Sequence, residues 1–195
     1  MVDEIILVTG KEEISYCQKE IIEKYNIKKV KAIVSGGKER YHSVFCGLQA
    51  LEKEESTAQY VMIHDGARPF IDDAIIERCA QGVEKYKACV AGMPVKDTIK
   101  IADEDLFAVQ TPNRSNVWMV QTPQTFERTM IWDAYKTIIA EEQSGKTISV
   151  TDDAMVVEKM TDYKVKMILG SYENIKITTP EDLQIAQLFC DKRQY

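Results

Sequence analysis

The sequence of 195 residues has few of the side chains that build metal clusters or disulfide frameworks. It contains two histidines, His42 and His64. It also contains five cysteines, which are Cys17, Cys46, Cys79, Cys89 and Cys190. The cysteines are scattered, odd in number and never form a C-x-x-C pair, so neither a disulfide framework nor a zinc site is expected. We expect most of them to be small buried residues in a reducing cytoplasm.

Long apolar runs and an excess of positive charge are also lacking. No run approaches the roughly 20 residues of a membrane span, and the opening "MVDEII" has no basic region typical of a signal peptide. The formal net charge is -6 and the isoelectric point is about 5.1. An acidic surface repels nucleic acid phosphates. We therefore expect a cytoplasmic protein that binds neither nucleic acid nor membrane, whereas a small nucleotide stays possible in a locally positive pocket.

The first half of the chain alternates between apolar strand patterns and helical spacing. Continuous apolar runs predict strands at 4–10, 30–35, 60–64 and 88–95. Helical spacing follows the first three of them, with Asp72 expected to cap the third helix. Strands that are apolar throughout indicate burial on both faces. The pattern predicts an α/β fold, a mostly parallel sheet with helices on both sides, in a single domain over residues 1–195.

The alternation is interrupted at about 96–122. Two short strand-like runs, Thr98–Ile101 and Asn116–Gln121, surround acidic and Asn/Pro turns, and we expect them to form a hairpin-like arm. Helical spacing resumes near Ile131. A short helix capped by Thr151, strands at "VKMILGS" and "NIKIT", and a closing helix with Thr179 as its cap and Pro180 at its first position are expected to follow.

Polar residues directly after the strands are the candidates for chemistry, because ligands of open parallel sheets bind at the carboxyl ends of strands. Asp65 follows the third strand, and a carboxylate there can hold Mg²⁺ between phosphate oxygens. Arg68 could pair with a phosphate or orient Asp65. The alternative is an ordinary turn with a structural Asp–Arg pair.

Three more places in the sequence admit both a functional and a structural interpretation. Gly36 and Gly37 before a helix resemble an anion site, with Ser43 within reach of a ligand, but they are also compatible with a simple strand-to-helix turn. Arg114 could bind a phosphate monoester or be a solvated charge. Lys176 alternates with Ile175 and Ile177, so it faces either a polar cleft or a sheet edge.

Six segments, taken in order, are similar to the 2-C-methyl-D-erythritol 4-phosphate cytidylyltransferase family. They are "SGGKERYHSV", "HDGARPF", "PVKDTIK", "TPNRSNVWMVQTPQTF", "TDDAMVVE" and "ENIKITTPEDL", which together span most of the chain. Ribitol 5-phosphate cytidylyltransferases are near relatives and remain an alternative, although their pattern usually differs around "PVKDTIK" and "TPNRS". The resemblance implies a Rossmann-like nucleotidyltransferase sheet with a projecting β-arm that builds a homodimer.

The resemblance also implies a reaction and a set of site residues. In the family, CTP and methylerythritol 4-phosphate react to give a CDP-sugar alcohol and pyrophosphate, with Mg²⁺ as cofactor, in isoprenoid precursor biosynthesis. Catalytic roles are carried over to Arg114 and Lys176, and the metal role to Asp65. The substrate-binding positions are Gly37, Lys38, Ser43, Asp65, Arg68, Thr98 and Thr122. Lys38 stands where some members have an acidic residue, and Glu173 is carried over only weakly, as a neighbour of the metal.

One departure from the family pattern concerns the beginning of the chain. The family's first strand and Gly-rich loop, which grip the triphosphate, have no counterpart before "MVDEIILVTG". The difference is roughly 30 residues or more, the scale of a βαβ element. We expect these residues alone to bind CTP weakly and turn over slowly. A non-catalytic nucleotide-binding dimer is therefore a further alternative at this point.

Overall fold

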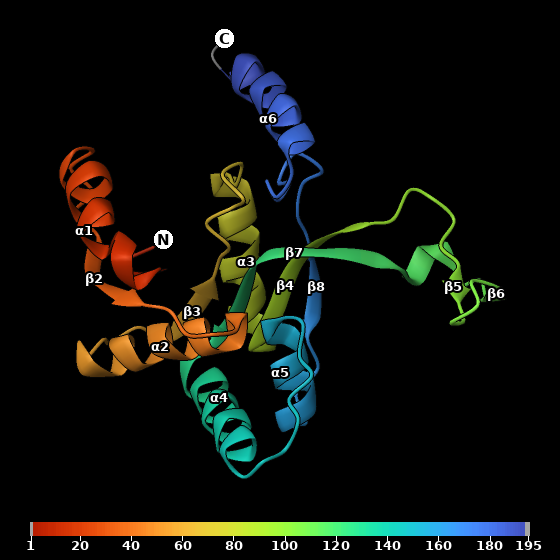
Figure 1. Cartoon of the computed structure of the whole chain (residues 1–195), viewed down its shortest axis with the longest axis horizontal. Helices are drawn as coiled ribbons and strands as arrows, with labels where there is room; N and C mark the ends of the chain where they lie inside the picture. Colours follow the sequence, from red (N-terminus) through yellow and green to blue (C-terminus); the bar gives the residue numbers. More distant parts are fainter. Residues whose placement is uncertain (1, 194–195) are drawn as a thin grey trace. The chain divides into compact units, whose positions relative to one another are not determined.

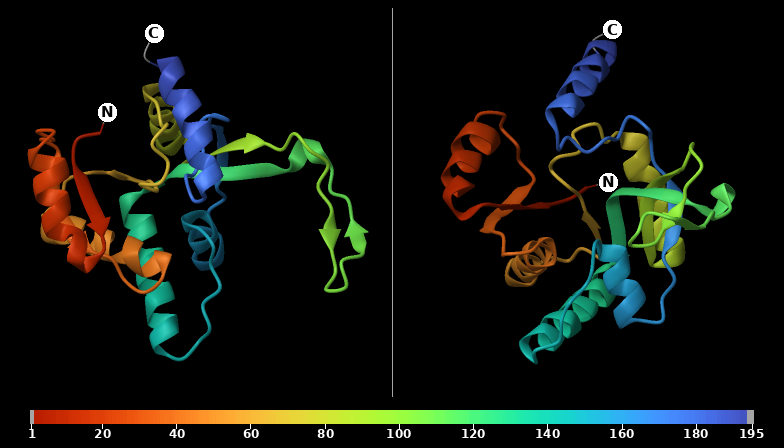
Figure 2. Two further views of the ribbon diagram at one scale, coloured as in Figure 1. Left: turned by 45° about the horizontal axis from the view of Figure 1, so that its top comes forward. Right: turned by 45° about the vertical axis from the view of Figure 1, so that its right-hand side comes forward.

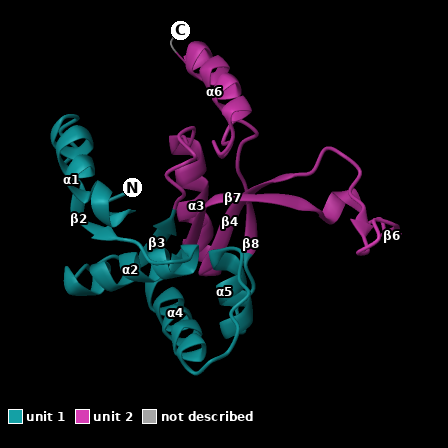
Figure 3. Cartoon of the chain, viewed as in Figure 1, with its two compact units in different colours: residues 1–63, 126–165 teal, residues 64–125, 166–195 magenta. Residues whose placement is uncertain are grey.

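The computed structural model describes residues 2–193, which divide into two compact units (Figure 3). Unit 1 comprises residues 1–63 and 126–165, and unit 2 comprises residues 64–125 and 166–195. The chain thus leaves and re-enters each unit once. Among the described residues, no helix combines the length and apolar character needed to cross a membrane.

Unit 1 begins with a parallel strand pair. β1 (Ile5–Thr9) pairs with β2 (Val30–Ser35), with Thr9 opposite Ser35. Between them the chain passes through η1 (Lys11–Glu13), α1 (Ile14–Tyr16) and the π-helical η2 (Cys17–Glu23). The helix α2 (Arg40–Lys53) packs on both strands and is followed by β3 (Tyr60–Ile63). The strands predicted at 4–10, 30–35 and 60–64 are confirmed.

The second part of unit 1 is helical. α4 (Arg128–Gln143) buries one stripe, and it packs against α2 and α5 (Asp153–Met160). The buried stripe contains the four residues expected from their spacing, Ile131, Ala134, Tyr135 and Ile138. The predicted cap of α5 was wrong by one residue, because the Asp152 side chain, not that of Thr151, accepts the Met155 N–H at 2.9 Å.

Unit 2 contains a sheet in which β7 (Trp118–Glu127, within this unit up to Thr125), β4 (Ala88–Pro94) and β8 (Lys166–Leu169) are neighbours in that order. β4 and β8 are parallel. The helix α3 (Asp73–Tyr86) packs on β4 and β8 (Figure 1). Its cap is Asp72, which accepts the Ile75 N–H at 2.8 Å as predicted.

The arm of unit 2 is a short hairpin whose strands differ from those expected. β5 (Ile101–Ala102) pairs antiparallel with β6 (Ala108–Gln110), and η3 (Arg114–Asn116) leads into β7. Most of Thr98–Ile101 is irregular, and the end of Asn116–Gln121 belongs to β7. The Asp103 carboxylate accepts the N–H groups of Asp105 and Phe107 and so fixes the turn. Figure 1 and the left view of Figure 2 show the hairpin extending away from β4 and β8.

The chain ends in unit 2 with an irregular segment and α6 (Pro180–Arg193). The strand predicted at "NIKIT" was wrong, since residues 174–178 have no strand hydrogen bonding. Ile177 instead donates its N–H to the Ala67 carbonyl at 2.8 Å, which fastens the segment to a loop. Pro180 is the first residue of α6, as predicted.

Candidate active site

Three of the predicted site residues meet in unit 2, and they are Asp65 and Arg68 from the loop that follows β3 in the sequence and Lys176 from the segment before α6. The Asp65 Oδ2 atom lies 3.0 Å from Lys176 Nζ and 3.9 Å from Arg68 Nε. Arg68 also donates its backbone N–H to the Asp65 carbonyl at 3.0 Å. The segment is therefore both a turn and a charged cluster, so the two interpretations of the sequence are compatible. Lys176 faces this cluster and is not a decoration of a sheet edge.

The two kinds of nitrogen in the Arg68 guanidinium differ in their hydrogen bonding. Its Nη1 donates to the Asn174 carbonyl at 2.8 Å, whereas its Nε is buried without a hydrogen-bond partner. Burial lowers the pKa of Arg68, and the nearby Asp65 carboxylate partly opposes that shift. A buried donor without an acceptor is costly, so an anionic oxygen that reached this group would be stabilised.

Asn174 is a site residue that the sequence did not reveal. It is fully buried, and its Nδ2 donates to the Thr122 carbonyl on β7 at 2.8 Å. The backbone carbonyl of Asn174 accepts the hydrogen bond from Arg68. Asn174 therefore connects β7, the Asp65 turn and the segment that carries Lys176. The one available signal was its place two residues before Lys176, in a stretch that resembled a strand.

The Thr122 hydroxyl, predicted to lie beside the substrate pocket, contacts the Asp65 turn. Its Oγ1 accepts the Asp65 N–H at 3.1 Å and lies 3.0 Å from His64 Nδ1. His64 Nε2 lies 3.0 Å from the Arg68 carbonyl. Partial removal from water lowers the pKa of His64, although the residue keeps an exposed face.

Thr98 and Arg114 lie in the arm segment and are exposed. Arg114 Nη1 donates to the Lys96 carbonyl at 2.9 Å. The Lys96 ammonium in turn stacks over the Tyr172 ring at 3.7 Å, and the Tyr172 hydroxyl donates to the Pro94 carbonyl. The base of the arm is thus anchored near the end of β4. Thr98 and Arg114 lie on either side of the β5–β6 hairpin in the sequence, and the hairpin extends away from β4 and β8 (Figure 1).

The predicted glycine loop lies in unit 1, where β2 leads into α2. Gly37 donates its N–H to Ser43 Oγ at 3.1 Å, so two of the predicted residues are in direct contact. A Cβ on Gly37 would lie 2.3 Å from His42 Cβ, which means that no other residue fits there. A Cβ on Gly36 would lie 2.6 Å from Ser43 Oγ, so a larger residue there would displace the Ser43 hydroxyl.

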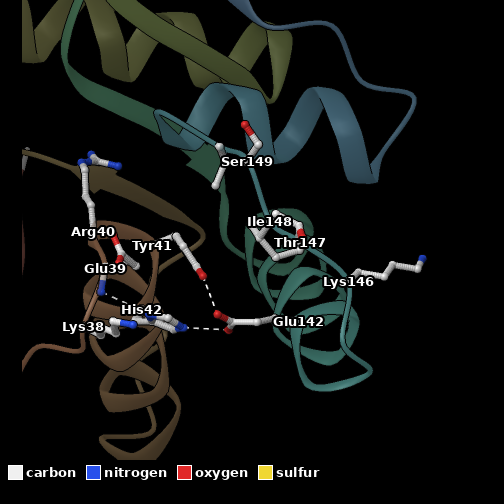
Figure 4. A pocket seen from close by; sticks show the side chains of 11 residues that line it. Lys38, Glu39, Arg40, Tyr41, His42, Glu142, Lys146, Thr147, Ile148 and Ser149 are labelled. Carbon is white, nitrogen blue, oxygen red and sulfur yellow. Dashed lines mark hydrogen bonds and ion pairs between the residues drawn. The ribbon is translucent and has the colours of Figure 1, made fainter.

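Lys38 belongs to the rim of a cavity of about 530 Å³ in unit 1 (Figure 4). The start of α2, Glu142 on α4 and the segment 146–150 line it. Glu142 accepts hydrogen bonds from the Tyr41 hydroxyl at 2.6 Å and from His42 Nε2 at 2.7 Å. The bonds from Tyr41 and then His42 lower the pKa of Glu142, and the bond to Glu142 raises the pKa of Tyr41 to about 12.

A second buried group stabilises the same region of unit 1. Arg40 Nη1 and Nη2 donate to the two carboxylate oxygens of Asp153 at 2.9 and 2.7 Å, and the Tyr135 hydroxyl donates to Asp153 as well. Asp153 is fully buried. Burial, reinforced by the Asp153 charge, raises the pKa of Tyr135. The sequence indicated only that Asp153 belongs to the start of a helix. Its ion pair with Arg40 leaves no local pattern, because the two residues are 113 positions apart.

The carboxylates near Lys176 set what kind of metal site is possible. Within residues 2–193 there is no group of three or more His, Cys, Asp or Glu side chains that could hold an ion. Glu173 lies 3.9 Å from Arg193 in an ion pair. Asp65 as a carboxylate ligand still fits Mg²⁺, because this ion usually takes one or two carboxylates and completes its shell with substrate phosphates and water.

A carboxylate flanked by lysine and arginine, on loops that follow the strands of an α/β fold, is typical of enzymes that transfer phosphate-linked groups. The class is that of the nucleotidyltransferases. The chain belongs to the family described as 2-C-methyl-D-erythritol 4-phosphate cytidylyltransferase (IspD), whose model matches residues 1–192.

Individual relatives agree with this membership. The chain is 46% identical to the 2-C-methyl-D-erythritol 4-phosphate cytidylyltransferase of Caldanaerobacter subterraneus subsp. tengcongensis, over 98% of this chain and 80% of the relative. It is 49% identical to that of Lachnospira eligens, over 96% and 79%.

Solved structures confirm the predicted α/β nucleotidyltransferase fold. The 4-diphosphocytidyl-2C-methyl-D-erythritol synthase of Anaerococcus prevotii superposes with a TM-score of 0.86 at 37% identity, covering 97% of this chain and 79% of that one. The cytidylyltransferase of Francisella tularensis gives a TM-score of 0.75 at 25% identity, covering 95% and 80%.

Proposed function

We propose that this chain transfers the cytidylyl group of CTP to 2-C-methyl-D-erythritol 4-phosphate and releases pyrophosphate, a step of isoprenoid precursor synthesis. The observation that carries the proposal is the cluster of Asp65, Arg68 and Lys176 in a chain of this family. Lysine and arginine beside a carboxylate suit a reaction between two anionic phosphates, because catalysis of such transfers is mostly positioning and charge stabilisation.

The reaction joins a phosphate oxygen of the sugar alcohol to the α-phosphorus of CTP and breaks the bond to pyrophosphate. We assign Lys176 to the attacking phosphate, where it leaves its ion pair with Asp65 and orients the nucleophile. The Arg68 guanidinium, with its buried Nε, stabilises charge on the reacting phosphates. A magnesium ion held by Asp65 and the nucleotide would offset the charge of the triphosphate.

The remaining site residues take supporting roles in the proposal. Gly37 and Lys38, in the tight loop before α2, and Ser43, in the first turn of α2, bind the cytosine base. Thr98 and Arg114 act on the sugar phosphate from the arm of a second subunit, since the arm extends away from its own sheet. We accordingly propose a homodimer joined through the arms, with residues 1–195 as one nucleotidyltransferase domain. The five free thiols fit a cytoplasmic setting.

The test compares acceptors in a pyrophosphate-release assay with CTP and Mg²⁺. Methylerythritol 4-phosphate, ribitol 5-phosphate and buffer are supplied in parallel at equal concentrations. The proposal predicts rapid release with methylerythritol 4-phosphate and little with the other two. Faster release with ribitol 5-phosphate would contradict the assigned acceptor. Binding of CTP in calorimetry without release for any acceptor would contradict the assignment as an enzyme.

A further inference from the structure

The imidazole of His64 has no part in the proposed transfer, yet both of its nitrogens are engaged. Nδ1 lies 3.0 Å from the Thr122 hydroxyl, and Nε2 lies 3.0 Å from the Arg68 carbonyl. Thr122 Oγ1 also accepts the Asp65 N–H at 3.1 Å. His64 and Thr122 therefore contact both ends of the turn that presents Asp65 and Arg68.

The directions of these hydrogen bonds follow from which groups can only donate or only accept. A carbonyl only accepts, so Nε2 of His64 carries a proton and donates it to Arg68. A neutral imidazole has a single N–H, so Nδ1 is an acceptor. The Asp65 N–H only donates, and the Thr122 hydroxyl accepts it while giving its own proton to Nδ1. The chain of donors thus runs from Asp65 through Thr122 and His64 to Arg68.

We infer that His64 is a positioning residue, which fixes the directions of the Asp65 carboxylate and the Arg68 guanidinium by closing the turn that carries them. The inference rests on the proposed function, which supplies the phosphates that Asp65 and Arg68 would handle. With both ring nitrogens committed to the protein, His64 does not exchange protons with a substrate. Further hydrogen bonds connect the turn to β7. The Thr122 carbonyl accepts one from the Asn174 side chain, and the Asn174 carbonyl accepts one from Arg68.

The first test reads the position of the ring proton directly. Long-range ¹H–¹⁵N spectra distinguish the two neutral forms of histidine, and only two histidines have to be assigned. A His42→Gln spectrum identifies the signals of His64. The inference predicts that neutral His64 carries its proton on Nε2. A proton on Nδ1 would overturn it, because the ring could not then donate to the Arg68 carbonyl.

The second test separates positioning from a general loss of stability. His64→Ala is expected to lower kcat about tenfold, the equivalent of one lost hydrogen bond. His64→Gln places an amide near the Nε2 position and His64→Asn places one near Nδ1, so each restores part of kcat. Asp72→Ala is the matched control, since loss of the α3 cap destabilises the same unit and leaves the Asp65 turn intact.

The outcomes are distinct from those for the proposed function. Positioning predicts that His64→Ala loses kcat while Asp72→Ala keeps it at a similar loss of thermal stability. Wild-type kcat in folded His64→Ala would overturn the inference. Absence of cytidylyl transfer by the unchanged protein would overturn the proposed function instead, and the proton position would still decide whether His64 closes the turn.

Discussion

At the scale of single residues, the charge of Lys176 is the most consequential feature of the candidate site. Its ammonium is nearly half exposed and is paired with the Asp65 carboxylate at 3.0 Å. A flexible, accessible cation of this kind can exchange one anionic partner for another at small cost. The ion pair therefore places Lys176 where it is ready to receive a substrate phosphate.

Replacing Lys176 is expected to affect the sugar phosphate more than the nucleotide. Lys176→Ala should lower kcat/KM for methylerythritol 4-phosphate about 100-fold, the usual loss for one charge-stabilising donor, with a smaller change in CTP affinity by calorimetry. Lys166→Ala, which removes an exposed lysine elsewhere in unit 2, is the control. Unchanged kinetics of Lys176→Ala would refute the assigned role.

Asp153 illustrates a residue whose importance is structural. It is fully buried and bound by both Arg40 and Tyr135. Asp153→Ala leaves the buried Tyr135 hydroxyl without its acceptor and the one-third-exposed Arg40 without its counter-charge, so it should lower the free energy of unfolding by about 3 kcal/mol. Urea titration of the variant measures this. Asp133→Ala, which breaks an exposed pair with Lys136, should cost below about 1 kcal/mol.

At the scale of elements, the helices and main strands follow from the sequence, but the connections between them do not. α4 buries the residues that its spacing indicates, because a helix with one apolar stripe packs that stripe against the core. The stretch 174–178 alternates like a strand and is irregular. Its polar groups bind the Asp65 turn and β7, and such distant partners leave no local pattern.

The same distinction applies to the candidate site. Asp65, Arg68 and Lys176 could be recognised as charged residues at expected loop ends. Asn174 and the link between His64 and Thr122 could not, since they depend on which loops meet in the folded unit. The resemblance to a family supplied the roles of the arm residues, which charge and spacing alone left open.

The contact between α2 and α4 predicts a specific dependence of stability on pH. Hydrogen bonds from Tyr41 and His42 lower the pKa of Glu142 from its ordinary value of 4.5. A carboxylate with a lowered folded pKa stabilises the protein above its unfolded pKa, and this contribution is lost as the pH falls through the folded value.

Urea midpoints measured between about pH 6 and pH 3 test that dependence. Glu142→Gln should show a smaller fall in midpoint on acidification than the unchanged protein, and Tyr41→Phe an intermediate fall, because one of the hydrogen bonds remains. If Glu142→Gln and the unchanged protein fell in parallel, the hydrogen bonds seen in Figure 4 would not stabilise unit 1 in solution.

At the scale of the whole molecule, the arm points to assembly. Leu106, Phe107 and Val109 are 85%, 72% and 61% exposed on a small hairpin, an unusual density of apolar side chains in water. A second subunit that covered this hairpin would remove these side chains from water, as the proposed arm-mediated dimer requires.

Sedimentation equilibrium measures the assembly. We expect a dimer for the unchanged protein, and Phe107→Asp should raise the dissociation constant at least about tenfold, as the loss of a buried aromatic anchor does. Tyr163→Asp, on an exposed aromatic of unit 1, is the control and should remain dimeric. A monomeric unchanged protein at millimolar concentration would contradict the arm-mediated dimer.

The central claim is that Asp65, Arg68 and Lys176 handle the reacting phosphates, and a crystal structure with the cytidylylated sugar alcohol and Mg²⁺ tests it most directly. The account predicts that Lys176 Nζ has left Asp65 and lies within hydrogen-bond distance of a phosphate oxygen of the ligand. A ligand bound with no contact to Lys176 or Asp65 would contradict it.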